Sequence, residues 1–307
     1  MRILVTGASG LLGINLALEA SQDHEVYGLV HIHTLQSTPF TVIQGDLRIP
    51  GTAERILNQV QPDWVIHCAA LANVDACEAD PAQAIKMNTE IPRQLAKLVA
   101  RGGARLLHVS TDAVFDGKRG NYDEQDQPNP LGVYSRTKLE GEAAVAEANP
   151  DAIIGRVNLF GFSLSGKRSL GEFFLYNLQA GKRVMGFTDV YFCPLLANDL
   201  AHIFLKMLAL RLSGLYHVVS RQSMSKYDFG TAIAQRFNLN AGLIQPTSVA
   251  QAGLAATRSP NLTLKSDKLA AALGEPPPDI ISGLEKFYTL YLQGYPTRLQ
   301  GMDDSRR

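Results

Sequence analysis

Short apolar runs alternate with segments of helical period along the first half of the chain. Residues 11–20 and 131–147 repeat their polar and apolar positions as amphipathic helices do. The apolar runs end at Val5, Val30, Ile43, Ile66, Val109 and Ile154. Such an alternation is typical of parallel βαβ units. It predicts an α/β fold with a doubly wound, Rossmann-type parallel sheet.

The second half of the chain has a looser pattern. Helices are expected at 169–180, 198–212 and 226–237, and a strand at 214–219. Apolar residues of the middle helix keep the i, i+3, i+4 spacing of a face that packs on a core; they are Leu200, Ile203, Phe204, Met207 and Leu208. We interpret them as packing residues.

Three glycines follow the first apolar run at intervals of three, at Gly7, Gly10 and Gly13, and a helical pattern begins at Leu11. Between a strand and a helix, glycines let the backbone approach a pyrophosphate, and the start of the helix offers N–H groups and a positive dipole end. Glycines also serve ordinary turns. Their place directly after the first strand nevertheless favours a dinucleotide site.

The change of pattern predicts how the chain is divided. Residues 1–157 are expected to form an NAD(P)-binding domain, and residues 188–219 to return to it. The segments 158–187 and 220–300 are expected to form a smaller C-terminal α/β substrate lobe. The polar tail, 301–307, is expected to be frayed.

Tyr134 and Lys138 lie one turn apart if residues 131–147 are helical. An ammonium beside a phenol favours the ionised form and lowers a pKa that is normally near ~10. Such a pair is suited to proton exchange at neutral pH. The plain alternative is a surface tyrosine and lysine that share a helix face.

The charge balance narrows the class of partner. The 307 residues include 29 Lys+Arg and 29 Asp+Glu, so nothing indicates nucleic acid or a membrane surface. Cys68, Cys77 and Cys193 have neither a paired framework nor a metal-type spacing, which fits a reducing compartment. Met1 leads directly into a strand, and no apolar run approaches the roughly 18 residues of a membrane span. We expect a cytoplasmic protein with small-molecule partners.

Six motifs carry a resemblance to a known family; they are Gly7 to Gly13, Gly45 to Leu47, Pro62 to Ala70, Ser110 to Gly117, Tyr134 to Lys138, and Arg258 to Asn261. Through them nearly the whole chain resembles the extended short-chain dehydrogenase/reductases, and within these the dTDP-4-dehydrorhamnose reductase group. A regulatory β subunit of methionine adenosyltransferase shares the Ser-(Ser/Thr)-Asp-x-Val-Phe-Asp-Gly pattern on the same scaffold. The motifs are therefore more specific for the superfamily than for the group.

The resemblance implies three catalytic residues, Thr111, Tyr134 and Lys138. Tyr134 would exchange the proton, and the Thr111 hydroxyl would hold the substrate oxygen. The family's hydroxyl residue stands immediately before Asp112, which favours Thr111 over Ser110, and Ser110 should face the other side of the strand. Lys138 would lower the pKa of the tyrosine and bind the nicotinamide ribose.

The resemblance also implies a set of cofactor-binding residues; besides Tyr134 and Lys138 they are Gly7, Ser9, Gly10, Leu11, Leu12, His31, Asp46, Leu47, Cys68, Ala69, Ala70 and Asn88. Asp46 would accept a hydrogen bond from the adenine amino group. Ala69 and Ala70 are small enough to admit the cofactor. Asn88 would complete a proton path through water, or would instead be a core asparagine bound to backbone.

The end of the second predicted strand bears on the choice between NADP(H) and NAD(H). The carboxylate that usually binds the adenosine ribose is missing there, where His31 and His33 stand. This absence favours NADP(H) and leaves NAD(H) as the alternative, although a histidine is only a weak cation for a 2′-phosphate. The two histidines have no third ligand spaced nearby, so no metal site is predicted.

Ala113 distinguishes between two reactions, the elimination of water and the reduction of a ketone. Sugar-nucleotide 4,6-dehydratases of the superfamily have Thr-Asp-Glu where this chain has Thr111, Asp112 and Ala113, and they need the second acid to eliminate water. The sequence therefore favours NADP(H)-dependent reduction of a 4-keto-6-deoxy sugar nucleotide. Two alternatives stay open: a sugar-nucleotide epimerase that retains its cofactor, and a non-catalytic nucleotide-binding regulatory subunit.

Two positions depart from the reductase group. Asn15 stands where a glutamate is associated with a metal-bridged dimer, and residues 191–195 replace the usual Gly-x-Pro-Thr. The identity of the sugar and the presence of a homodimer stay open.

Overall fold

A computed structural model describes residues 1–251 and 259–304. Its centre is a seven-stranded sheet in the order β11-β6-β5-β4-β1-β2-β3, with every neighbouring pair parallel. The strands are β1 (Arg2–Thr6), β2 (Glu25–Val30), β3 (Thr41–Gln44), β4 (Trp64–His67), β5 (Arg105–Thr111), β6 (Ile153–Val157) and β11 (Gly214–Val218). The prediction of a doubly wound parallel sheet is confirmed.

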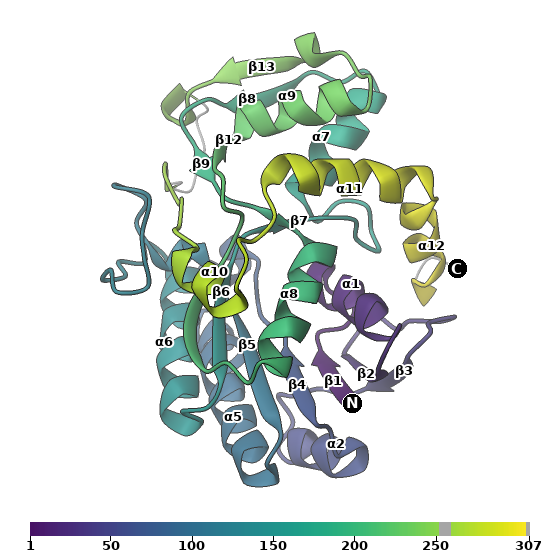
Figure 1. Cartoon of the computed structure of the whole chain (residues 1–307), viewed down its shortest axis with the longest axis vertical. Coiled ribbons are helices and arrows are strands. Elements are labelled where there is room, and N and C mark those ends of the chain that lie inside the picture. Colours follow the sequence, from purple (N-terminus) through teal and green to yellow (C-terminus); the bar gives the residue numbers. More distant parts are fainter. Residues whose placement is uncertain (252–258, 305–307) are drawn as a thin grey trace.

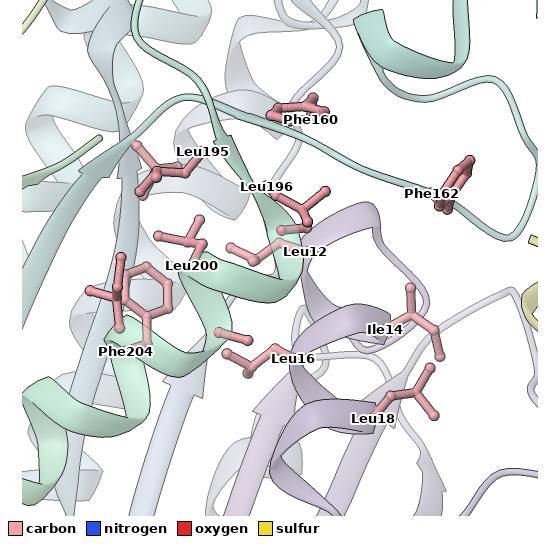
Figure 2. Close-up of a cluster of buried hydrophobic side chains, with 14 of the residues drawn as sticks. Leu12, Ile14, Leu16, Leu18, Phe160, Phe162, Leu195, Leu196, Leu200 and Phe204 are labelled. Atoms are coloured by element: carbon pink, nitrogen blue, oxygen red, sulfur yellow. The ribbon is translucent and has the colours of Figure 1, made fainter. Parts of the chain in front are cut away.

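Helices cover both faces of the sheet (Figure 1). One face carries α1 (Leu11–Ala20) and α8 (Ala197–Ala209), and the other carries α2 (Thr52–Val60), α5 (Ile91–Gly102) and α6 (Val133–Ala148). The five apolar residues predicted to pack from 198–212 are all buried. Figure 2 shows two of them, Leu200 and Phe204, beside Leu12 and Leu16 of α1. This packing fixes the first helix, and hence the turn that precedes it.

A smaller group of elements lies beyond the carboxyl ends of the strands (Figure 1). It contains three two-stranded ladders, β7 (Leu159–Phe160) with β10 (Leu195–Leu196), β9 (Tyr191–Phe192) with β12 (Met224–Ser225), and β8 (Val184–Phe187) with β13 (Ile244–Thr247). Three helices pack with them, α7 (Leu170–Gln179), α9 (Lys226–Arg236) and α11 (Ile280–Leu292). Phe160 contacts the rings of Phe229 and Phe287 and so joins these helices to the end of the sheet.

Two C-terminal helices contact the elements around the seven-stranded sheet. Lys268 of α10 (Asp267–Leu273) donates a 2.7 Å hydrogen bond to the carbonyl of Leu215 in β11. Tyr295 of α12 (Tyr295–Gly301) donates to Asn15 of α1 at 2.8 Å. The division of the chain into a nucleotide-binding domain and a substrate lobe stays a prediction.

The expected fraying also does not extend over 301–304. Met302 is buried, and its carbonyl accepts a hydrogen bond from the backbone N–H of Gln36. A bridge between Leu35 and Asp303 and a hydrogen bond from the N–H of Asp304 to the carbonyl of Thr34 also hold this segment. In the described parts of the chain, no helix combines the length and apolar composition needed to cross a membrane.

Candidate active site

The carboxyl ends of β1, β5 and β6 open on a cavity of about 850 Å³. Thr111, at the end of β5, lines it together with Tyr134 and Lys138 of α6. Gly132 is the N-cap of α6 and has an extended backbone, and the helix begins at Val133. Tyr134 and Lys138 therefore lie in its first two turns. The structure thus brings together the three side chains that the sequence proposed as catalytic.

The glycine turn between β1 and α1 leaves no room for side chains. Gly7 has φ +69°, and a Cβ there would lie 2.8 Å from the backbone nitrogen of Ala69. A Cβ on Gly13 would lie 2.2 Å from the carbonyl oxygen of Gly7. Helix α1 begins after Gly10 without a side-chain cap, and Leu11, Leu12 and Gly13 line the cavity. Such a helix start fits the pyrophosphate of a dinucleotide.

A second cavity, of about 320 Å³, lies beside the ends of β2 and β3. Most of the residues predicted to bind the cofactor line it; they are Gly7, Ser9, Gly10, His31, Asp46, Leu47, Cys68, Ala69 and Ala70. The two cavities share Gly7, Gly10, Cys68, Ala70, Leu71 and Arg168, so they adjoin at the glycine turn. This shape fits an extended dinucleotide.

Arg48 is a feature of the second cavity that the sequence reasoning missed. Its guanidinium donates to both oxygens of Asp46, at 2.8 to 3.0 Å, and lies 3.3 Å from Nε2 of His31. The hydrogen bonds from Arg48 lower the pKa of Asp46 to about 2. The sequence could have indicated Arg48, because it is a cation two residues after Asp46, the predicted adenine ligand.

Asn88, which was predicted to bind the cofactor, is buried and lines neither cavity, but it contacts Leu71, which lines both. Its Oδ1 accepts from the N–H of Leu71 at 2.9 Å, and its Nδ2 donates to the Leu71 carbonyl and to the Thr137 hydroxyl at 3.1 Å. It belongs to a single π-helical turn, Lys86–Glu90. These contacts are those of the core asparagine that the sequence held open as one alternative, and they fix the position of Leu71.

Thr111 and Asp112 form the polar end of the first cavity. The Thr111 hydroxyl donates to Oδ1 of Asp112 at 3.1 Å and accepts from the N–H of Ala113 at 3.2 Å. Asn158 donates to Oδ2 of Asp112 at 2.5 Å. Burial nevertheless raises the pKa of Asp112 to about 6. These two hydrogen bonds orient the Thr111 hydroxyl at the wall of the cavity.

The electrostatics of Tyr134 differ from the expectation. Burial raises the pKa of Tyr134 to about 12, and the hydrogen bond with Thr111 offsets this only in part. Lys138 instead donates to the carbonyl of Val109 at 2.6 Å, and burial lowers the pKa of Lys138 to about 8. Burial is therefore the dominant influence on the pKa of both groups in this structure.

Ser110 faces away from Thr111, as the alternation along the strand predicts. It donates to Glu142 at 2.5 Å, and Glu142 forms a buried ion pair with Arg156 at 2.7 Å. These groups fasten α6 to β5 and β6. In the sequence, the only sign of this contact was that Glu142 follows Lys138 by one helical turn and so lies on the same face of the predicted helix.

His67 and His108 form a buried stack beside Lys138, with ring centroids 5.4 Å apart. Burial and the charge of Lys138 lower the pKa of both imidazoles, so the rings are neutral. Nδ1 of His67 lies 2.7 Å from the Thr6 hydroxyl. Among the described residues, no group of three or more His, Cys, Asp or Glu could hold a metal ion.

Residues 1–292 match the family model described as the RmlD substrate binding domain. The chain belongs to this family. A dTDP-4-dehydrorhamnose reductase of Mycobacterium tuberculosis is 34% identical over 278 residues, 88% of this chain and 87% of that protein. A probable low-salt glycan biosynthesis reductase, Agl14, of Haloferax volcanii is 33% identical over 300 residues, 95% and 99% of the two chains. Methionine adenosyltransferase 2 subunit beta of Danio rerio is 32% identical over 279 residues, 87% and 84%.

Solved structures of RmlD-like reductases have the same fold. The dTDP-4-dehydrorhamnose reductase of Bacillus anthracis in complex with NADP superposes with a TM-score of 0.80 at 26% identity, over 94% of this chain and 98% of that one. Reductases of the RmlD family are NAD(P)-dependent oxidoreductases of the extended short-chain dehydrogenase/reductase type, and the match assigns this chain to that class. The Arg258 end of one quoted motif lies outside the described residues.

Proposed function

We propose that this protein reduces the keto group of a 4-keto-6-deoxy sugar nucleotide with NADP(H). The observation that carries the proposal is that Thr111, Tyr134 and Lys138 line one cavity, which adjoins a second at the glycine turn. A dinucleotide in this groove would place its nicotinamide end beside the three side chains. The substrate would then enter from the lobe predicted for residues 158–187 and 220–300, of which the structure describes 158–187, 220–251 and 259–300.

The three side chains divide the proton chemistry between them. When bound, the reduced nicotinamide supplies a hydride to the carbonyl carbon. The Tyr134 phenol gives its proton to the carbonyl oxygen, which becomes the new hydroxyl. The Thr111 hydroxyl, which donates to Asp112 in this structure, would turn to donate to that oxygen and hold it in place. Lys138 would bind the nicotinamide ribose and stabilise the phenolate until solvent returns the proton.

Arg48 supports NADP(H) over NAD(H). His31 ends the second strand where an acid would bind a free ribose, and the Arg48 guanidinium lies against it. A planar cation with several donors suits a 2′-phosphate better than a histidine alone. The related Bacillus anthracis reductase was solved with NADP, which agrees with this choice.

Ala113 supports reduction over dehydration. Its N–H binds Thr111, but its methyl side chain brings no second acid to the cavity. The likeness to methionine adenosyltransferase 2 subunit beta keeps a regulatory role as the rival function.

We place the protein in the cytoplasm, since its three cysteines are unpaired.

The test is to follow NADPH oxidation with a panel of 4-keto-6-deoxy sugars carried on dTDP, UDP and GDP. Turnover with at least one member is the expected result. Tightly bound oxidised cofactor without net NADPH oxidation would replace the proposal with an epimerase. NADP⁺ binding without turnover on any substrate, together with capture of a synthetase partner, would replace it with a regulatory subunit.

A further inference from the structure

Arg168 reaches the point where the two cavities meet. It lies in the loop between β7 and α7, far along the chain from the glycine turn, yet it lines both cavities. The other residues that line both are uncharged; they are Gly7, Gly10, Cys68, Ala70 and Leu71. The Arg168 side chain is exposed, and its guanidinium has no hydrogen bond or ion pair with any residue in 1–251 or 259–304.

Glu172 fixes the loop that carries Arg168. The fully buried Glu172 carboxylate accepts hydrogen bonds from the N–H groups of Ser163 at 2.6 Å, Arg168 at 2.9 Å and Ser169 at 3.2 Å. It also accepts from the Ser163 hydroxyl at 2.8 Å. In turn, the Ser169 hydroxyl oxygen accepts a hydrogen bond from the N–H of Glu172 and so caps the start of α7. The backbone of Arg168 is therefore held in place while its side chain remains available.

The other cations of the groove have different proposed partners. Arg48, which is paired with Asp46, is proposed to meet the 2′-phosphate, and Lys138, which donates to the Val109 carbonyl, is proposed to meet the nicotinamide ribose. The start of α1 offers backbone N–H groups and about half a positive charge, whereas a pyrophosphate has two negative charges. A free guanidinium at the junction of the cavities supplies the missing positive charge with bidentate geometry.

We propose that Arg168 binds the pyrophosphate of the dinucleotide from the side opposite the glycine turn, and that Glu172 is its positioning residue. The inference rests on the proposed function, because it requires the dinucleotide to lie in this groove. It adds that a loop of the substrate lobe takes part in cofactor binding. The diphosphate of a sugar nucleotide has the same chemistry, but the adenosine-side cavity that Arg168 also lines favours the cofactor.

Calorimetric titration of the full chain separates the two sources. Arg168→Met should weaken NADP⁺ binding roughly ten- to hundredfold, the effect of losing a charge-assisted hydrogen bond. It should leave the affinity for adenosine 2′-monophosphate, which has no pyrophosphate, unchanged. The matched control is Lys167→Met, an exposed neighbour that lines neither cavity, and it should bind NADP⁺ as the unaltered protein does.

Several results would overturn the proposal. One is unchanged NADP⁺ affinity in Arg168→Met; another is a loss confined to dTDP, which would assign Arg168 to the substrate diphosphate. Either can occur while the unaltered protein still reduces a sugar nucleotide, so the proposed function would survive. Failure of the unaltered protein to bind any dinucleotide would instead remove both.

A double-mutant cycle tests the positioning role of Glu172. Glu172→Gln should weaken NADP⁺ binding in the unaltered background and have little further effect in the Arg168→Met background. Arg168→Lys should restore part of the affinity. A merely structural Glu172 would lower the Tm equally in both backgrounds and leave NADP⁺ affinity unchanged, which would refute its positioning role.

Discussion

The Lys138 ammonium donates a 2.6 Å hydrogen bond to the carbonyl oxygen of Val109, two residues before Thr111 on the same strand. The contact ties α6, which also carries Tyr134, to the end of β5. It also keeps the lysine charge in a buried place, where burial lowers the pKa of Lys138 to about 8. One side chain thus links the packing of a helix to the electrostatics of the cavity.

Lys138→Ala should reduce both turnover and NADP⁺ affinity, because the ammonium is proposed to serve the phenol and the ribose. In the unaltered protein, turnover should fall as the pH rises above about 8, where Lys138 loses its proton. Lys97→Ala, an exposed position of α5, is the control. A Lys138→Ala variant with normal cofactor affinity would remove the ribose contact from the mechanism.

Arg48→Gln should weaken NADP⁺ binding roughly tenfold or more and change NAD⁺ binding little, because only NADP⁺ has the 2′-phosphate. Titration calorimetry with both cofactors measures the difference. Arg55→Gln, on the exposed side of α2, is the matched control. Equal losses for the two cofactors would mean that Arg48 only orients Asp46.

Asp112→Asn should change how stability depends on pH. Burial raises the pKa of Asp112 to about 6 in the folded state from 3.8, so the native state binds more protons than the unfolded state between these values. This group makes the free energy of unfolding fall as the pH rises through the window, by at most about 3 kcal/mol. The free energy of unfolding should be measured with urea near pH ~4 and pH ~7. Relative to the unaltered protein, the Asp112→Asn variant should be more stable at pH ~7 than at pH ~4. A difference that is the same at both pH values would contradict the raised pKa.

Gly13→Ala should destabilise the fold by about 1–3 kcal/mol, because its Cβ would collide with the Gly7 carbonyl in a tightly packed turn. Gly102→Ala is the control, since a Cβ there meets nothing within 4 Å, and a helical alanine should stabilise by up to about 1 kcal/mol. Thermal unfolding tests this prediction, because the Tm of Gly13→Ala should fall and that of Gly102→Ala should not. Equal Tm values would show that the turn can relax.

The order of strands and helices could be predicted because each element carries its own period. The glycine turn and the Tyr134–Lys138 pair were visible for the same reason, since each depends on residues a few positions apart. Arg48 and His31 are 17 residues apart and come together only through the pairing of β2 with β3. No local pattern shows which of several exposed arginines will meet the histidine.

Arg168 and Met302 show the same limit more strongly. Each is far in sequence from its neighbours, and each lies in a segment without helical or strand period. Arg168 reaches the glycine turn because the buried Glu172 folds its loop, and Met302 returns to the core because α12 packs on α1. Such contacts depend on the whole fold, whereas sequence periodicity reports only local structure.

The most direct test of the account is to measure NADPH oxidation and NADP⁺ affinity together for Tyr134→Phe, on whichever sugar nucleotide the unaltered protein reduces. The variant keeps the ring and its packing but has no transferable proton. We predict a loss of turnover of ~10²–10⁴-fold with NADP⁺ affinity nearly unchanged. Turnover within about threefold of the unaltered protein, a small part of what a general acid contributes, would mean that Tyr134 is not the proton donor and would contradict the proposed mechanism.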